Sequence, residues 1–200
     1  MQASIPSSQT IEKYAAVRPI PYHYGSVENS GGRFKLLLDY LMAVLTILML
    51  MPLFLSIAVA VKLDSDGPMF YRQRMLGRNG RIFYAYRFRT ISVMGMKRTR
   101  VGHFLIRTGL AELPLLINIL KNEISFVGPR PVTPEQIVMY GAYAERLLSV
   151  TPGITGYWQV NGYQQGKRIE QDMQYIETCS MMNDLKILFK TVTAVFQIQK

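Results

Sequence analysis

Arginines in closely spaced pairs and between prolines are the side chains of this sequence best suited to binding phosphate. The segments YRQR and YRFRT each place two arginines two residues apart, Arg72 with Arg74 and Arg87 with Arg89, so each pair lies on one face of a strand. Arg130 stands in GPRP, where the prolines preset the backbone and hold the guanidinium at little entropic cost. Guanidinium groups bind phosphate oxygens bidentately, so we expect these side chains to bind a diphosphate or an anionic lipid. A structural salt bridge for Arg130, and simple solvation of one of the pairs, are the competing interpretations.

A single carboxylate, Glu112, interrupts the segment TGLAELPLLINIL at the expected start of a helix. It either satisfies amides at the helix N-terminus, worth about 0.3–1 kcal/mol, or takes part in chemistry. Trp158 and Gln159 belong to TPGITGYWQVNGYQQG, whose glycines and prolines predict a loop with a short strand. Gln159 either borders a substrate pocket or belongs to an ordinary packed loop. His23 and His103 have no partner at metal-ligand spacing, so neither is assigned a role.

The composition indicates a membrane-associated protein with an anionic partner. Apolar residues make up 49% of the 200 residues and charged residues only 18%, which is unusual for a freely soluble chain. The net charge of +10 is concentrated in residues 63–110, where ten Lys and Arg accompany only Asp64 and Asp66. Such a field favours a lipid headgroup, a phosphorylated lipid or a diphosphate, although basic runs are often only solvated faces. Cys179 is the only cysteine, which excludes an internal disulfide framework.

An uncharged run over residues 40–61 predicts a membrane-inserted helix. Its 22 residues would extend about 33 Å as a straight helix, enough to cross a bilayer. Pro52, near its centre, removes a backbone hydrogen bond and predicts a kink. Basic side chains flank both ends of the run, namely Arg33, Lys35 and Lys62. Because basic flanks favour the cytoplasmic side, we expect a re-entrant helix over residues 32–62, with a bent spanning helix as the alternative.

The rest of the chain predicts an α+β fold that is mainly helical. Two aromatic-rich strands separated by residues 77–80 form a basic β-hairpin, because Asn79 and Gly80 tolerate positive φ. A helix is expected to begin at Thr133, where Gln136 completes a capping box. Further helices are expected over residues 101–107, 111–120, 169–178 and 183–197. The last has an apolar stripe that either packs against the domain or lies in the membrane interface, formed by Leu185, Leu188, Phe189, Val192 and Phe196.

Four motifs, in this order, resemble those of the bacterial sugar transferase family, the monotopic polyprenyl-phosphate phosphoglycosyl transferases that begin the assembly of cell-surface polysaccharides. They are FKLLLDYLMAVLTILMLMPLFL, DGPMFYRQRMLGRNGRIFYAYRFRT, AELPLLINILKNEISFVGPRP and TPGITGYWQVNGY, and the resemblance covers residues 32–200. It implies transfer of a hexose 1-phosphate from a UDP-sugar to undecaprenyl phosphate with release of UMP. It further implies a covalent phosphosugar-enzyme intermediate, Mg²⁺ as cofactor and the start of exopolysaccharide or O-antigen synthesis. The form WQV resembles members that transfer glucose or galactose phosphate.

The sequence departs from the family at the residue that would carry the reaction. Family members carry Asp-Glu-Leu-Pro, in which the Asp is the nucleophile and the Glu helps to hold magnesium, whereas this chain has Ala111 followed by Glu112. A methyl group cannot attack phosphorus, and Glu112 is turned by about 100° from Ala111 along a helix, so it does not replace the Asp. The resemblance therefore implies a magnesium ligand at Glu112 in an inactive chain. An engineered substitution, a natural inactive relative and an active variant with another nucleophile are the three explanations.

The resemblance also implies a location and partners. The protein is expected at the cytoplasmic face of the bacterial inner membrane, in contact with phospholipid, and a homodimer is compatible with so small an anchored domain. Residues 1–31 are expected to form a flexible leader, 32–62 the re-entrant membrane helix and 63–200 the cytosolic catalytic domain. A nucleic-acid protein that stacks bases on the hairpin aromatics is disfavoured, because it gives no role to the proline-broken run. A non-catalytic scaffold or lipid-phosphate binding protein is the remaining alternative.

Overall fold

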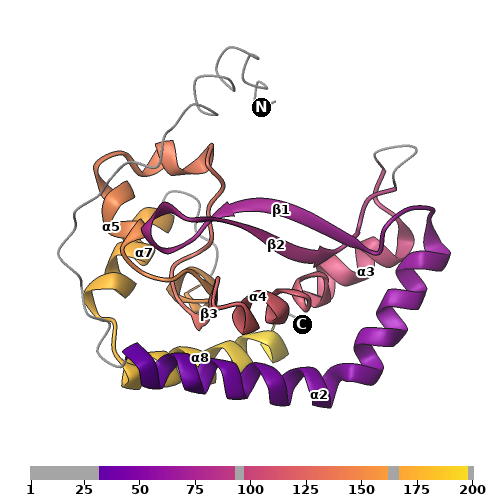
Figure 1. Cartoon of the computed structure of the whole chain (residues 1–200), viewed down its shortest axis with the longest axis horizontal. Coiled ribbons are helices and arrows are strands. Elements are labelled where there is room, and N and C mark those ends of the chain that lie inside the picture. Colours follow the sequence, from indigo (N-terminus) through magenta and orange to yellow (C-terminus); the bar gives the residue numbers. More distant parts are fainter. Residues whose placement is uncertain (1–31, 93–96, 162–166, 198–200) are drawn as a thin grey trace, which may run out of the picture.

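The computed structural model of the chain describes residues 32–92, 97–161 and 167–197, and its fold is mostly helical with two small sheets (Figure 1). This confirms the expected mainly helical α+β class. The leader expected over residues 1–31 lies outside the described residues, as do the last residues of the loop after Trp158.

The long apolar segment forms one continuous helix, α2 (Gly32–Asp64). Its residues are rich in Leu, Met and Ala, which favour helix, and only 11% of its most apolar stretch is buried inside the protein. α2 is therefore long and apolar enough to enter a membrane. Pro52 lies inside it without ending it, and Figure 1 shows α2 turning partway along its length. Assignment of this bend to Pro52, and a re-entrant course through the membrane, stay predictions.

The two halves of α2 pack against different parts of the fold. Ala43 in the first half is buried with Met75 and Phe83 of the hairpin and with Leu116 of the later helix α4 (Leu115–Leu120). Ile57 in the second half is buried in a separate cluster near the other end of the hairpin. The bend thus lets one apolar helix follow two sides of the domain.

The basic hairpin is confirmed. β1 (Phe70–Leu76) pairs antiparallel with β2 (Ile82–Phe88), and the short 3-10 turn η1 (Arg78–Gly80) joins them. Asn79 and Gly80 have φ of 58° and 70°, the left-handed conformation that their residue types tolerate.

The segment after the hairpin forms two helices with a break at the candidate motif. α3 (Arg100–Thr108) is capped by the Thr99 side chain, and Gly109 follows it with φ of 74°. The helix expected over residues 111–120 is wrong in its first half, because it divides into a 3-10 turn, η2 (Leu110–Glu112), and α4 (Leu115–Leu120). Pro114 precedes α4, where its missing N–H costs nothing.

A second, parallel sheet pairs β3 (Ser125–Val127) with β4 (Gly153–Thr155), which confirms the short strand expected after residue 151. A Cβ at Gly153 would lie 2.0 Å from the Gly128 nitrogen, so only glycine allows this close backbone approach. The capping box at Thr133 and Gln136 forms, with reciprocal hydrogen bonds of 3.2 and 3.3 Å. The α-helix expected there is wrong: a 3-10 segment, η3 (Gln136–Tyr143), breaks at Gly141 and is followed by α5 (Ala144–Leu148).

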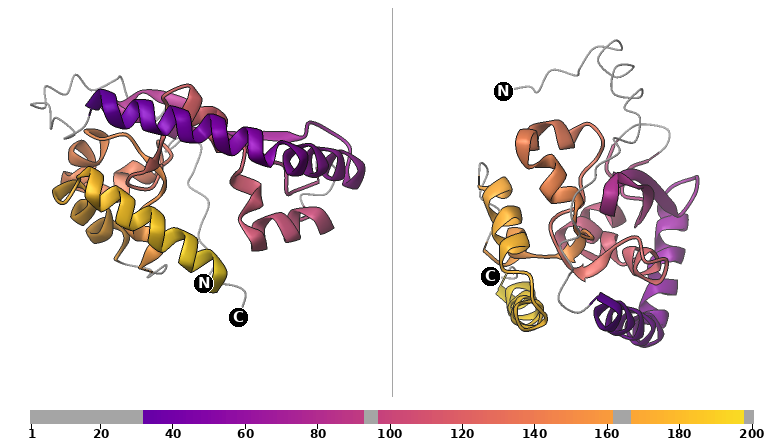
Figure 2. Two further views of the ribbon diagram at one scale, coloured as in Figure 1. Left: turned by 90° about the horizontal axis from the view of Figure 1, so that it is seen from below. Right: turned by 60° about the vertical axis from the view of Figure 1, so that its left-hand side comes forward.

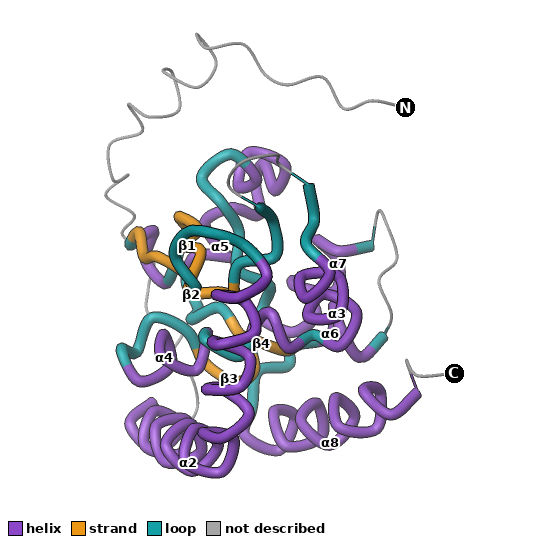
Figure 3. Tube along the Cα trace, turned by 90° about the vertical axis from the view of Figure 1, so that its right-hand side faces the viewer, coloured by secondary structure: helices purple, strands orange, loops and turns teal. Residues whose placement is uncertain are grey.

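In the described residues after β4 there are three helices: α6 (Tyr157–Val160), α7 (Arg168–Glu177) and α8 (Met181–Gln197). Figure 2 and Figure 3 show α8 on the same side of the molecule as α2. In α8, Ile187 is buried and Leu188 packs beside it, but the side chains of Leu185, Phe189 and Val192 are exposed. Most of the expected apolar stripe therefore does not pack against the domain, which leaves the membrane-interface interpretation.

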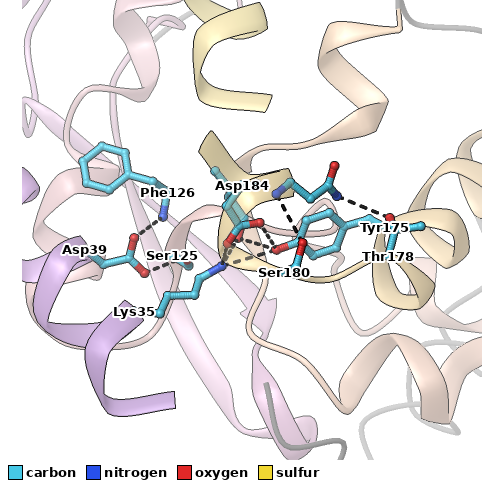
Figure 4. A network of polar contacts seen from close by, with 10 residues as sticks. Lys35, Asp39, Ser125, Phe126, Tyr175, Thr178, Ser180 and Asp184 are labelled. Atoms are coloured by element: carbon cyan, nitrogen blue, oxygen red, sulfur yellow. Dashed lines mark hydrogen bonds and ion pairs between the residues drawn. The ribbon is translucent and has the colours of Figure 1, made fainter. Parts of the chain in front are cut away.

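A polar network, called here the polar clasp, fastens the start of α2 to the domain (Figure 4). It consists of Lys35, Asp39, Ser125, Tyr175 and Asp184. Lys35 pairs with Asp184 of α8 and donates to the Val127 carbonyl at 3.1 Å, while Asp39 accepts a hydrogen bond of 2.7 Å from the Ser125 hydroxyl. Lys35 and Asp39 lie one helical turn apart in α2, and both form hydrogen bonds with other parts of the fold.

Candidate active site

One pocket collects side chains from three separate segments that the sequence had marked. Arg87 comes from β2, Glu112 from η2 and Arg130 from the GPRP turn after β3. The other polar side chains of the pocket wall come from β1, η3 and α6, and they are Gln73, Gln136 and Trp158. Arg87, Glu112 and Arg130 were each expected to bind phosphate or magnesium. They lie far apart in the sequence, and the fold brings them to one pocket.

Arg87 is held in place by two partners. Its guanidinium donates to the Gln73 side-chain oxygen at 2.7 Å and pairs with the Glu112 carboxylate at 3.1 Å. Both members of this ion pair are partly exposed, at 26% and 42%, so solvent screening limits its contribution to stability to about 1 kcal/mol or less. A pair that contributes so little is easily rearranged when an anionic ligand arrives.

Arg130 is positioned through its backbone and through an aromatic ring. Its backbone N–H donates to Asp172 at 3.1 Å, and its guanidinium lies over the Trp158 ring at 5.0 Å. Asp172 also accepts a hydrogen bond of 2.7 Å from the Tyr140 hydroxyl, and burial raises the pKa of both side chains. Asp172 is 1% exposed, and its hydrogen bond with the Arg130 N–H holds the GPRP turn in place.

Two N–H donors of the pocket have no hydrogen-bond partner among the described residues. They are Nε of Arg87 and Nε1 of Trp158, both buried. A buried donor without an acceptor costs about 1–3 kcal/mol, so such groups usually face a ligand or serve a function. The pocket therefore offers unused donors beside two arginines, an arrangement suited to a ligand rich in anionic oxygens.

Arg72 and Arg89 do not join this pocket. Arg72 lies over the Tyr86 ring at 5.3 Å, on the face of the hairpin opposite to Gln73 and Arg87, because adjacent strand residues point to opposite faces. Arg89 is 7% exposed and lies one residue beyond β2. Its guanidinium donates to carbonyl oxygens at the end of α2, those of Val61, Ser65 and Asp66.

Gln159 lies in α6 next to the pocket residue Trp158 but is not part of the pocket wall. Sequence reasoning missed Gln73 and Asp172. The hairpin register contains a signal for Gln73, because Gln73 and Arg87 occupy the same face. For Asp172 the sequence contains only a carboxylate among the buried positions of a helix.

Ala111 is 9% exposed, and its methyl group packs in an apolar cluster with Ile57, Val61, Phe88 and Leu105. It lies in the 3-10 turn η2, where successive side chains are separated by about 120°. Glu112 lines the pocket, whereas Ala111, one residue earlier, packs in the apolar cluster.

The pocket can supply one protein ligand to a magnesium ion. Within the described residues, no group of three or more His, Cys, Asp or Glu is placed to hold a metal. Glu112 is the carboxylate of the pocket wall and is 42% exposed. Magnesium commonly takes one or two carboxylates and completes its shell with water and substrate phosphates, so Glu112 fits that role when a diphosphate is bound.

Known proteins resemble this chain over most of its length. The sequence profile of the bacterial sugar transferases matches residues 31–198. The exopolysaccharide production protein ExoY of Sinorhizobium fredii is 35% identical over 206 residues, which cover 88% of this chain and 91% of that protein. The UDP-glucose:undecaprenyl-phosphate glucose-1-phosphate transferase of Escherichia coli is 34% identical over 91% of this chain, which spans 44% of that longer protein. The galactosyl transferase CpsE of Streptococcus agalactiae is 31% identical over 94% of this chain and 47% of its own length. The chain belongs to the bacterial sugar transferase family.

Proposed function

We propose that this protein is a polyprenyl-phosphate sugar-phosphate transferase of the kind that initiates exopolysaccharide synthesis. In this proposal the fold transfers a hexose 1-phosphate from a UDP-sugar to undecaprenyl phosphate and releases UMP at the cytoplasmic face of the inner membrane. Glucose and galactose are the favoured hexoses, because relatives that share 34% and 31% of their aligned residues with this chain are named for them. The WQV segment of α6 favours the same sugars.

The observation that carries the proposal is the assembly of Arg87, Glu112 and Arg130 around one pocket that also contains two unpartnered buried donors. A sugar nucleotide brings its charge in a diphosphate, which offers many acceptor oxygens. Arg87 and Arg130 approach such a group from β2 and from the GPRP turn, and the Arg87 and Trp158 N–H groups gain acceptors. Binding the diphosphate thus relieves a cost that the unliganded pocket carries.

Ala111 interrupts the covalent step that the family pattern implies. In that step a carboxylate oxygen forms a bond to the β-phosphorus of the donor, and the bond to the bridging oxygen breaks, so UMP leaves with the electron pair. An oxygen of undecaprenyl phosphate then attacks the same phosphorus and displaces the carboxylate. The Ala111 methyl group has no electron pair to donate, and we propose that this chain binds the donor without completing the transfer.

Glu112 is the side chain that would hold a magnesium ion. When bound, the ion would offset the negative charge of the diphosphate and of the departing phosphate. Arg87 holds Glu112 in the unliganded pocket at 3.1 Å, and a diphosphate would give that guanidinium a second anionic partner. Glu112 would then be available to the ion.

The test is to restore the carboxylate with Ala111→Asp in the full chain, in phospholipid nanodiscs that contain undecaprenyl phosphate. UMP release is measured with Mg²⁺ and UDP-glucose or UDP-galactose. We expect release from Ala111→Asp at least about a thousandfold above the unmodified chain, since loss of a nucleophile typically costs more than that.

Ala111→Asn is the matched control, because it has nearly the same shape and no nucleophilic carboxylate. Equal release from the Asp and Asn variants, or undiminished turnover by the unmodified chain, would contradict the proposed nucleophile position. If neither variant turns over and neither binds a UDP-sugar, the alternative of a non-catalytic membrane scaffold or lipid-phosphate binding protein is favoured.

A further inference from the structure

An apolar groove with a volume of about 460 Å³ lies between the second half of α2 and α3. Figure 1 shows α3 between the hairpin and this part of α2. The walls come from both helices, with Ser56, Ile57 and Ala60 on α2 and Val101, Phe104 and Leu105 on α3. The Ser56 hydroxyl donates to the Pro52 carbonyl of its own helix at 2.8 Å, so it is already occupied. Arg100, the charged side chain of the groove wall, belongs to the first turn of α3.

Water is a poor occupant of such a groove. Exposing apolar surface to water costs about 25 cal/mol per Å², and the Phe104 side chain alone is 57% exposed. Beside the groove, the α2 residues Leu55 and Val59 are 58% and 57% exposed, on a helix suited to lipid. The groove is therefore continuous with the apolar surface of α2 and suits a flexible hydrocarbon chain.

The floor of the groove is shared with the candidate active site. Ile57 and Leu105 line the groove and also pack against Ala111 in one buried cluster. After α3, Gly109 adopts the left-handed conformation that turns the backbone into η2, which presents Glu112 to the pocket. A single layer of side chains thus separates the groove from the position where the family nucleophile would stand.

We propose that this groove binds the polyprenyl chain of the acceptor and thereby brings the acceptor phosphate to the pocket of Arg87, Glu112 and Arg130. This inference rests on the proposed function for the nature of the acceptor. An amphiphile with a phosphate head and a long branched tail needs an apolar path that ends beside basic side chains. The groove lies beside exposed apolar residues of α2, and two residues of its wall, Ile57 and Leu105, pack in the cluster that contains Ala111.

The test is photocrosslinking of the full chain in nanodiscs of phosphatidylethanolamine and phosphatidylglycerol with a small fraction of undecaprenyl phosphate. Phe104 is replaced by p-benzoylphenylalanine, and mass spectrometry measures the ratio of polyprenyl to phospholipid adducts. The reference is the same photoreactive residue at Met49, which is 82% exposed on α2 and lies outside the groove wall. We expect the ratio at Phe104 to exceed that at Met49 at least about fivefold, which corresponds to about 1 kcal/mol of preference.

A variant that fills the groove tests whether the polyprenyl adducts at Phe104 come from the groove or from the nearby helix surface. Ala60→Trp places an indole inside the groove and should remove most of the enrichment at Phe104. Val59→Trp is the matched control, because Val59 is the preceding residue of α2 and is not part of the groove wall. It should leave the enrichment unchanged. Equal ratios at Phe104 and Met49, which would mean that ordinary phospholipid fills the groove, would overturn the proposal, as would equal effects of the two Trp variants.

Binding of a UDP-sugar, measured by calorimetry on the same nanodiscs, distinguishes the two proposals. Polyprenyl enrichment at Phe104 without UDP-sugar binding would support the groove and contradict the donor side of the proposed function. UDP-sugar binding without enrichment would contradict the groove and leave the proposed function standing.

Discussion

The polar clasp and the candidate active site are both built from charged side chains of several elements, but only the clasp satisfies its own polar groups. Lys35 has three partners, and Asp184 accepts from both Lys35 and Tyr175. In the pocket, Nε of Arg87 and Nε1 of Trp158 are buried without a partner among the described residues. A closed network of buried charges stabilises one arrangement of the chain, whereas unused donors reserve their binding capacity for a ligand.

The positions of the two regions agree with this division. The clasp joins α2 to β3, α7 and α8, so it determines how the membrane helix is attached to the domain (Figure 4). The pocket draws on β2, η2 and the GPRP turn, and its ion pair between Arg87 and Glu112 is partly exposed to solvent. Stability and ligand binding should therefore respond oppositely to substitutions in the two regions.

The largest effect is expected from breaking the clasp. Lys35→Met leaves the Asp184 carboxylate, 12% exposed, without its cation, and should lower the free energy of unfolding by about 3 kcal/mol. Thermal unfolding of the full chain in nanodiscs, followed by circular dichroism, measures the loss. The double variant Lys35→Met with Asp184→Leu should recover most of it, because the buried charge disappears together with its partner.

Arg146→Met provides the control, since its pair with Glu177 at 3.2 Å has side chains 39% and 56% exposed and should contribute less than about 1 kcal/mol. If Lys35→Met cost no more than Arg146→Met, or if the double variant were as unstable as the single one, the clasp would not be a stabilising element.

The sequence predicted the parts of this molecule that depend on neighbouring residues. Asn79 and Gly80 determine the hairpin turn because only a few residue types accept their backbone angles, and the length of the charge-free run predicts α2. The GPRP arginine and Glu112 were found because their types and immediate neighbours restrict their roles. These features depend on residue type and on immediate neighbours, so they could be predicted without knowledge of the tertiary structure.

Several features that the sequence did not predict depend on tertiary contacts. The ion pair between Lys35 and Asp184 joins residues that are 149 positions apart, so no local pattern could indicate it. Arg89 appeared equivalent to Arg87 from its spacing, but its guanidinium donates to backbone carbonyls just after α2. Asp172 was missed because its role depends on a backbone N–H that lies 42 residues away in sequence.

Substitution of a pocket residue is expected to have a smaller effect, which weakens ligand binding and does not lower stability. Trp158→Phe removes the unpartnered Nε1 donor and keeps an aromatic ring under Arg130. The unliganded protein should be at least as stable as before, because a buried unpaired group is lost, while the dissociation constant for a UDP-sugar should rise about fivefold, since a hydrogen bond worth about 1 kcal/mol disappears. Calorimetry and thermal unfolding on the same samples measure both quantities.

Tyr157→Phe is the matched control at the neighbouring residue. Its hydroxyl donates to the Asn183 side chain at 2.7 Å, so it behaves like a member of the clasp. Its removal should lower stability and leave UDP-sugar binding unchanged. If both variants changed stability and UDP-sugar binding in the same way, the proposed difference between donors that have a protein partner and donors kept for a ligand would be contradicted.

The smallest effect on stability is expected at Asp172. Like the clasp residues, it is buried with its hydrogen bonds formed, but it supports the pocket residue Arg130. Burial raises its pKa above 3.8, and the hydrogen bonds from Tyr140 and the Arg130 N–H only partly oppose this. Between pH 3.8 and the raised pKa, the folded state binds more protons than the unfolded state. Its contribution to stability is therefore greatest below pH 3.8 and is lost as the pH rises through the folded pKa.

Asp172→Asn should remove this dependence while keeping an acceptor for the Arg130 N–H. The difference in unfolding free energy between the variant and the unmodified chain should shift in favour of the variant as the pH rises from 3.8, by less than about 1.4 kcal/mol for each unit of pKa elevation. Glu177→Gln, at an exposed position of the same helix, should show no such trend. A flat difference at Asp172 would mean that its hydrogen bonds balance the effect of burial on its pKa, and a trend of opposite sign would mean that they outweigh it.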